Sequence, residues 1–257
     1  MAFQIASLKD SVHPDEWQLR VDLAAAFRLA ARYDWHEAVA NHFSAAVSDD
    51  GQRFLVNPVG SHFSRIRARD LVLVDTSQTG DSLSFGVDPT AWVLHSHIHR
   101  HVPRARCILH THMKYATTLA CLEGYEFQMV DQNACRFHDT IAYDRNYSGL
   151  ALDPEEGERV ARLFGADKEV LFLGNHGVVV CGAQMSYAYD DLYYLERACL
   201  VQVLAQSTGR PLVPVDPALA HRVGEQTRGE GDAERNKIYA DAYTRDPEFF
   251  EFYRSMQ

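Results

Sequence analysis

The stretch from residue 95 to residue 112 holds six of the chain's thirteen histidines and contains a change of secondary structure. Its first half has apolar and histidine side chains at helical spacing, and Pro103 ends that helix because proline has no amide hydrogen to donate. A short apolar run, 107–109, follows and leads directly into His110 and His112. Side chains two residues apart on a strand project from the same face, so these two imidazoles are placed to reach one divalent ion.

A third histidine, His176, lies in a short turn between two apolar runs, 170–173 and 178–180. Gly174 and Gly177 bracket the turn, and a histidine in such a position is placed for function more than for packing. Imidazole suits Zn²⁺, Fe²⁺, Mn²⁺ or Co²⁺, and three protein ligands leave a coordination position open, as in catalytic sites. From spacing alone, the alternative is a set of core histidines bonded to the backbone.

Composition limits the classes of partner and compartment. The net charge of −10 argues against a nucleic-acid backbone as the main partner, although a site can be locally positive for an anionic small molecule. The five cysteines are dispersed and form no CxxC pair, which is typical of reduced cytosolic thiols. No apolar run approaches the length of a membrane span, so we expect a soluble, cytoplasmic protein.

Helix and strand patterns alternate along the chain without a convincing linker, which predicts one α/β domain. An Asp-Gly pair at residues 50–51 predicts a hairpin, and Asp153 followed by Pro154 is typical of a helix start. The domain is expected over 15–211, between an N-terminal arm (1–14) and an aromatic-rich extension (212–257) that docks on the core or on a neighbouring subunit. The expected strands are 43–48, 53–56, 71–74, 107–109, 140–142, 170–173 and 178–180, and the expected helices are 15–33, 90–101, 113–121, 153–164 and 186–206.

Four histidines of the predicted helix 90–101 fall into two pairs, each with members four residues apart. His95 and His99 share one face and are candidates to line the same site as the metal ligands. The alternative is that they only pack or face solvent. His97 and His101 form the opposite pair and are expected to be solvated.

An ordered set of short motifs carries a resemblance to a known family. The chain resembles the class II aldolase/adducin-type domain family over residues 17–211. The resemblance implies a three-layer αβα sandwich with a mixed, largely antiparallel central sheet, a homotetramer, and an active site near a subunit interface. It also implies that His110, His112 and His176 hold one divalent metal ion (Zn, Fe or Mn). The motifs are Ala40-Asn41-His42-Phe43-Ser44, Asn57-Pro58-Val59-Gly60, Leu94-His95-Ser96-His97-Ile98-His99-Arg100, Ile108-Leu109-His110-Thr111-His112, Gly174-Asn175-His176-Gly177 and Leu195-Glu196-Arg197-Ala198.

The sequence departs from the sugar-phosphate aldolases of that family at their functional positions. Ala91 stands where those enzymes carry an acid/base glutamate, and no tyrosine occurs at 131–133, where they have a proton donor. Their phosphate cradle is degraded by an apolar residue or proline at three positions, Ala40, Val59 and Pro89, although Asn41, Gly60 and Thr90 can still donate hydrogen bonds. We therefore expect a substrate without a phosphate group.

The predicted function is a metal-dependent lyase that breaks a carbon–carbon bond of a small oxo- or hydroxy-acid, by retro-aldol cleavage or decarboxylation. His95, His99 or Asp131 is expected to move the proton, and Arg100 or Arg136 to pair with a substrate carboxylate. Further substrate contacts are expected from Asn41, His42, Gly60 and Thr90. Two alternatives are a non-haem Fe(II) oxygenase acting on an aryl keto acid and a non-catalytic adducin-like binding module.

Overall fold

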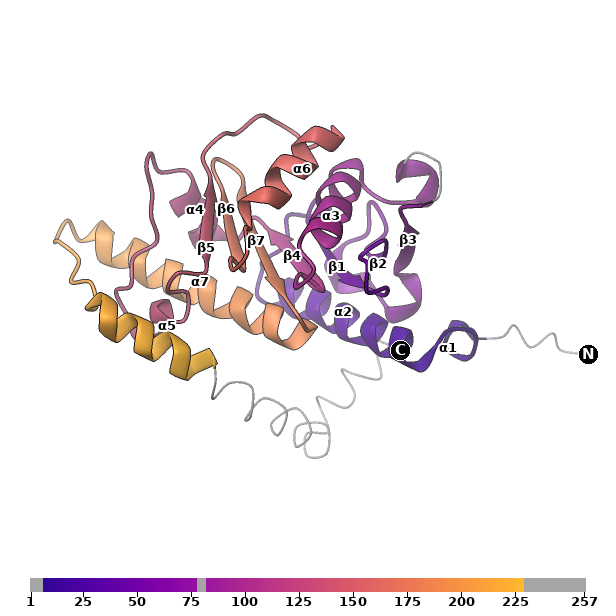
Figure 1. Cartoon of the computed structure of the whole chain (residues 1–257), viewed down its shortest axis with the longest axis horizontal. Coiled ribbons are helices and arrows are strands. Elements are labelled where there is room, and N and C mark those ends of the chain that lie inside the picture. The colour runs from indigo at the N-terminus through magenta and orange to yellow at the C-terminus, as the bar shows by residue number, and fades with distance from the viewer. Residues whose placement is uncertain (1–6, 78–81, 229–257) are drawn as a thin grey trace, which may run out of the picture.

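The computed structural model describes residues 7–77 and 82–228, and its centre is a seven-stranded sheet (Figure 1). Neighbouring strands pair antiparallel throughout, except that β5 and β6 are parallel. The predicted mixed, largely antiparallel sheet is therefore confirmed. In sheet order the strands are β3 (Val72–Asp75), β2 (Arg53–Val56), β1 (His42–Ala46), β4 (Cys107–Thr111), β7 (Gly177–Gly182), β6 (Val170–Leu173) and β5 (Ile141–Asp144).

Helices cover both faces of the sheet, which makes the three-layer sandwich that the resemblance implies (Figure 1). One layer holds α3 (Pro89–His101) and α6 (Pro154–Leu163). The other holds α2 (Pro14–Arg32), α4 (Lys114–Ala120) and α7 (Met185–Ser207). The shorter helical segments are α1 (Leu8–Ser11), α5 (Gln132–Cys135) and the 3₁₀ turns Phe63–Arg65, Ala68–Asp70 and Ser82–Phe85.

Alternation along the central strands divides the core between these two layers. Leu109 and Val178 are buried with the side chains of α2, α4 and α7, while their strand neighbours Ile108 and Val179 are buried with α3 and α6. Because successive side chains point to opposite faces, His110 lies on the same face as Ile108, toward α3 and α6. The period of the strands thus decides that the first metal-ligand candidate faces this layer.

Helix α3 is held at the sheet by its capped start and by its contact with α6. The Asp88 carboxylate accepts hydrogen bonds from the amides of Thr90 (2.9 Å) and Ala91 (3.3 Å), which satisfies two donors at the helix start. His97 faces Gly157 of α6, where an added Cβ would lie 2.7 Å from the imidazole Cδ2. The expectation that His97 is solvated is therefore wrong, because a glycine lets the two helices approach closely.

The described part of the C-terminal extension packs on its own chain. Residues 217–228 are helical, and Ala220 is fully buried. The Val215 amide donates to the Met129 carbonyl at 2.7 Å, and the Arg228 guanidinium donates to the Arg136 carbonyl at 2.7 Å. The aromatic part of the extension, 239–253, lies outside the described residues. Over 7–77 and 82–228, no helix is long and apolar enough to cross a membrane.

Candidate metal centre

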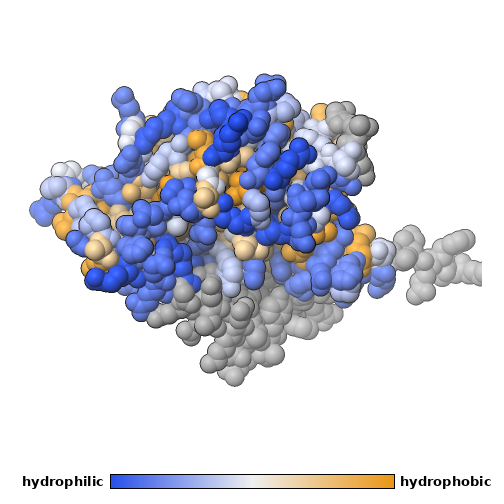
Figure 2. Space-filling view, viewed as in Figure 1, coloured by the Kyte–Doolittle hydropathy of each residue, from blue (hydrophilic) through white to orange (hydrophobic). Residues whose placement is uncertain are grey.

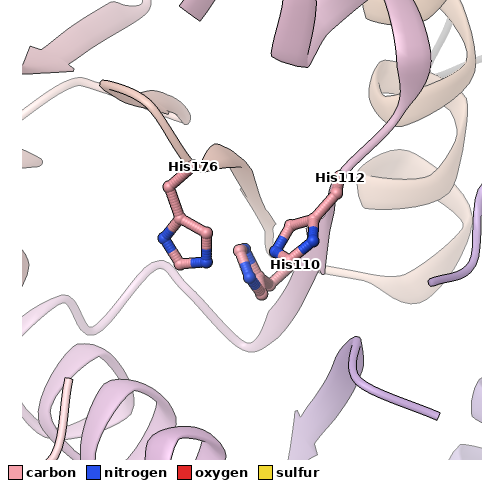
Figure 3. A group of neighbouring side chains, drawn as sticks. All are labelled: His110, His112 and His176. Carbon is pink, nitrogen blue, oxygen red and sulfur yellow. The ribbon is translucent and has the colours of Figure 1, made fainter. Parts of the chain in front are cut away.

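Three imidazoles converge at the ends of the central strands of the sheet, as Figure 3 shows. His110 and His112 come from the end of β4, and His176 comes from the turn between β6 and β7. One ligand nitrogen from each ring lies within 4.8 Å of the others, a spacing at which the three can hold a metal ion. The predicted trio is thus brought together by the pairing of β4 with β7, although the three residues are widely separated in sequence.

The hydrogen bonds around these rings leave nitrogens available to an ion. The His110 Nδ1 lies 3.0 Å from the Val178 carbonyl oxygen, to which it donates, so its Nε2 is left for a metal. The His112 Nδ1 lies 3.5 Å from a carboxylate oxygen of Glu37. The His112 Nε2 is buried and has no hydrogen-bond partner among the described residues. Metal-ligating histidines usually have their second nitrogen held by such a carbonyl or carboxylate, so the donor set fits a divalent ion.

The turn that carries His176 is tied to its surroundings by the backbone. Asn175 adopts the left-handed conformation with φ +57°, and its amide donates to the Ala120 carbonyl at 3.1 Å. Gly177 has no room for a side chain, because an added Cβ would lie 2.5 Å from the Thr111 carbonyl oxygen and 2.8 Å from the His112 Cδ2. The glycine therefore allows the strand that follows His176 to pass directly beside His112.

Burial keeps the histidines of the site uncharged near neutral pH. Removal from water lowers the pKa of His176 to about 4 and the pKa of His42 to about 3. The same cause lowers the pKa of His110 and His112. Only the neutral imidazole has a lone pair to offer a metal, so the folded protein presents these rings in the state that an ion requires.

A cavity adjoins the metal-ligand candidates and is lined by both polar and apolar residues. The lining includes His110, His176 and His42 and the segment 146–151. Asp144 and Glu156 also line the cavity, but both carboxylates are bound by the Arg159 guanidinium. Among the described lining residues there is no lysine or arginine. The cavity therefore offers no free side-chain cation for a phosphate group.

Hydrophobic side chains are exposed over β6 and α6, two elements that contribute residues to the cavity lining (Figure 2). In Figure 2 they gather near the middle of the visible face, around β6, β7 and α6, within a largely hydrophilic surface. Tyr147 and Leu150, from the segment 146–151, are 57% and 70% exposed. The Tyr147 ring lies 6.4 Å from the ring of His176, measured between centroids. A phenol is thus present close to the place where a metal-bound substrate would lie.

Comparison with known proteins identifies the family. The sequence model of the "Class II Aldolase and Adducin N-terminal domain" matches residues 21–203. The chain belongs to the class II aldolase and adducin family. A Caulobacter vibrioides protein assigned to the class 2 aldolases, without an established reaction, is 35% identical over 85% of this chain and 84% of its own length. Mouse alpha-adducin is 31% identical over 81% of this chain and 29% of its own length.

The same family relationship appears among solved structures. A crystal structure of an aldolase II superfamily protein from Pseudomonas syringae superimposes with a TM-score of 0.80. It is 34% identical and covers 93% of this chain and 97% of its own chain. The class II aldolase fold is therefore shown for this chain, and the candidate metal centre lies inside the matched region.

Several candidate residues of this family member lie away from the cavity. Arg136 is buried, and its guanidinium donates to Asp190 and Asp191 at 2.6 Å each. Asp131 accepts a hydrogen bond from the Ala134 amide at 2.7 Å and so begins α5. Arg100 is exposed and points to Thr76 at 3.4 Å. The structure does not bring these three to the metal-ligand candidates, because Arg136 is paired with α7, Asp131 caps α5 and Arg100 is exposed beside Thr76.

The remaining candidates are divided between the cavity wall and the layer behind it. His42 and Thr90 line the cavity, whereas His95 and His99 are buried between α3 and β1, behind His42. Gly60 is in a turn with φ +73°. These positions favour His42 and Thr90 over His95 and His99 as substrate contacts.

Asn41 is 1% exposed, and its side-chain amide has no hydrogen-bond partner among residues that the structure describes.

Ala91, where sugar-phosphate aldolases carry glutamate, is buried among apolar side chains that include Phe54 and Val87. The methyl group at position 91 thus supports packing and supplies no acid or base.

Sequence reasoning missed several residues near the site, and the signals for them differ. Ser44 stands two residues after His42, so strand periodicity alone places both on one face. No sequence pattern indicated Glu37, because its distance from His112 depends on the path of the loop before β1. Tyr147 lies in the connection from β5 to α6, whose path sequence patterns leave undefined, and Glu156 lies in the first turn of α6, whose docking on the sheet brings it to the cavity.

We expect the buried His99 to make the protein less stable in mild acid. Burial lowers its pKa from an ordinary 6.5 to about 3, and the charge of Arg106 acts in the same direction; His95 is its other titratable neighbour. Below pH 6.5 the unfolded state takes up a proton that the folded state rejects, so the free energy of unfolding falls as pH drops toward 3. The slope from one such group approaches about 1.4 kcal/mol per pH unit.

The measurement is urea unfolding at pH 7, 6 and 5 for the wild type and for His99→Gln, which removes the titrating group but keeps a hydrogen-bond acceptor. The variant should show a shallower pH dependence than the wild type. His101→Gln, at the exposed end of the same helix, is the matched control. Equal slopes for the wild type and His99→Gln would contradict the assignment.

Proposed function

We propose that this protein is a divalent-metal-dependent lyase that breaks a carbon–carbon bond of a small, non-phosphorylated oxo- or hydroxy-acid. The observation that carries the proposal is the trio His110, His112 and His176, whose free nitrogens converge beside a cavity. Three protein ligands leave coordination positions for a substrate. Membership of the class II aldolase family supports lyase chemistry at this place.

The ion supplies one part of the chemistry when bound. An ion bound there would supply Lewis-acid chemistry toward the carboxylate and the oxo or hydroxyl oxygen of the substrate. His110, His112 and His176 would hold it, with Glu37 and the Val178 carbonyl fixing the orientation of two of the rings. The absence of lysine and arginine among the described lining residues favours a substrate without phosphate.

We assign the donation of the proton that completes the reaction to a residue that lines the cavity. His95, His99 and Asp131 were the sequence candidates, but the first two lie behind His42 and the third caps α5. Tyr147 instead has its ring 6.4 Å from that of His176, between centroids, and lines the cavity. We therefore assign to the Tyr147 phenol the donation of a proton to the enolate carbon. In decarboxylation the phenolate regains its proton from water, and in retro-aldol cleavage it takes up the proton that the substrate hydroxyl releases. The homotetramer implied by the resemblance stays a prediction.

The test is turnover of a panel of oxo- and hydroxy-acids by protein loaded with Zn²⁺, Mn²⁺ or Fe²⁺, in the presence and absence of oxygen. A lyase releases two products under strict anaerobiosis, and the Tyr147→Phe variant should turn over at least about tenfold more slowly with metal retained. Turnover that consumes oxygen and stops without it would support the oxygenase instead. A purified wild type that binds no divalent metal would support the binding module.

A further inference from the structure

A continuous chain of hydrogen bonds runs from the cavity wall into the interior between β1 and α3. The His42 Nδ1 lies 2.7 Å from the His95 Nε2, and the His95 Nδ1 lies 2.5 Å from the Ser44 hydroxyl. That hydroxyl lies 2.7 Å from the His99 Nε2, and the His99 Nδ1 lies 2.8 Å from the Ala105 carbonyl oxygen. All four side chains are at most 3% exposed.

The two-residue period of strand β1 and the four-residue spacing on helix α3 bring the members of this hydrogen-bond chain together. His42 and Ser44 are two apart on β1 and face the α3 layer, since their partners across the strand pair are His110 and Ile108. His95 and His99 are four apart on α3 and point back at the sheet. The side chains of β1 therefore alternate with those of α3 along the hydrogen-bond chain, each within hydrogen-bonding distance of the next.

The interior end of the chain fixes the direction of every hydrogen bond. The Ala105 carbonyl only accepts, so the His99 Nδ1 carries the proton and the His99 Nε2 of a neutral ring accepts. The Ser44 hydroxyl must then donate to His99 and accept from the His95 Nδ1. His95 is left with a bare Nε2, to which His42 donates from its Nδ1.

The reverse direction is excluded by charge. If Ser44 donated to His95, the His99 Nε2 would have to donate to Ser44, and His99 would carry protons on both nitrogens. A charged ring at that depth has no carboxylate among its described hydrogen-bond partners, and burial lowers the pKa of His99 to about 3. The neutral arrangement is therefore the one that the packing allows.

The cavity end of the chain leaves one acceptor exposed to a ligand. The His42 Nε2 lies 3.5 Å from the Thr90 hydroxyl, but that hydroxyl donates to Asp88 at 2.5 Å and has no second proton. The His42 ring also lies beside His110, with centroids 4.8 Å apart. The bare nitrogen thus sits in the cavity wall next to a metal-ligand candidate.

We propose that His95, Ser44 and His99 are positioning residues that fix His42 as a hydrogen-bond acceptor, and that the site therefore selects substrates with a hydroxyl donor next to the metal-bound oxygens. This inference rests on the proposed function and narrows it to hydroxylated oxo- or dihydroxy-acids. A ligand with a methyl or ether group at that place would leave the nitrogen buried without a partner. We expect a preference of about tenfold or more for the hydroxylated ligand.

The first experiment reads the tautomer directly and needs neither metal nor substrate. Nitrogen-15 spectra of histidine-labelled protein should show the His42 Nδ1 protonated and the Nε2 bare, with His42→Gln used to assign the signals. Ser44→Ala should convert His42 to a mixture of tautomers. Ser96→Ala, a buried serine of α3 that bonds only within its own helix, is the matched control. A proton on the Nε2 of neutral His42 in the wild type would overturn the proposal.

The second experiment measures selectivity by calorimetric titration of the Zn²⁺-loaded protein. Hydroxypyruvate and pyruvate present the same chelating carboxylate and oxo groups, and only hydroxypyruvate adds a neighbouring hydroxyl. The wild type and Ser96→Ala should bind hydroxypyruvate about tenfold more tightly, and Ser44→Ala should lose the preference with unchanged zinc content. Equal affinities in the wild type, or a preference kept in Ser44→Ala, would overturn the inference. Failure of the wild type to bind zinc would overturn the proposed function, while the tautomer spectra would still decide this inference.

Discussion

Replacing His110 by alanine is expected to reduce bound divalent metal from about one ion per chain to less than about a tenth, because two imidazoles do not hold the ion against competing chelators. His176→Ala should have the same effect. His176 lies in a turn and is only partly buried, so its loss disturbs packing less than the loss of His110. The measurement is elemental analysis after dialysis against a weak chelator, with circular dichroism to confirm that the variants are folded.

The matched control is His101→Ala, which removes an exposed imidazole from the end of α3. It should keep the wild-type metal content. Full stoichiometric metal in both His110→Ala and His176→Ala would show that the ion is bound elsewhere. Loss of metal in His101→Ala as well would point to non-specific binding by surface histidines.

The second large effect is expected at Gly177, where alanine should cost about 3 kcal/mol or more of unfolding free energy. Its Cβ would lie 2.5 Å from the Thr111 carbonyl oxygen and 2.8 Å from the His112 ring, so strands β4 and β7 must separate. That movement displaces His112 relative to His176. Metal affinity should therefore fall by about ten- to a hundredfold, the range found for changes around metal ligands.

Gly182→Ala, at the other end of β7, separates the two effects. Its added Cβ would lie 3.0 Å from the Ala188 side chain, far along the strand from the histidines. It should lower stability by a smaller amount and leave zinc affinity unchanged. Chemical unfolding and competition with a fluorescent zinc chelator provide the two measurements. Wild-type metal affinity in Gly177→Ala would show that the turn tolerates movement and that the geometry of the ligands does not depend on it.

A catalytic and a non-catalytic function place different requirements on the site around the buried hydrogen-bond chain. A binding module needs only that His42, His95, Ser44 and His99 be satisfied, which the chain achieves. A lyase also needs a group in the cavity lining that can bind the substrate, and the hydrogen-bond chain provides the His42 Nε2 as an acceptor beside His110. The metal content therefore distinguishes a lyase from a binding module, because packing fixes the tautomer of His42 in either case.

The sequence by itself determined the metal-ligand candidates and most of the elements that carry them. His110 and His112 are two apart at the end of an apolar run, and His176 sits in a glycine-bracketed turn. Such short-range patterns specify local conformation directly, because strand and helix periods act over a few residues. The hairpin of β1 and β2 and the start of α6 at Pro154 were predicted for the same reason.

Tertiary structure alone decided which polar side chains face the cavity. His95 and His99 shared a helix face, as expected, but that face meets β1, so Ser44 and His42 take up their hydrogen bonds. Arg136 was predicted to pair with a substrate carboxylate, but its guanidinium donates to two carboxylates of α7. The physical reason is that a side chain's partner across a sheet or between layers depends on strand register and helix docking. Neither leaves a trace in the spacing of residues along one chain.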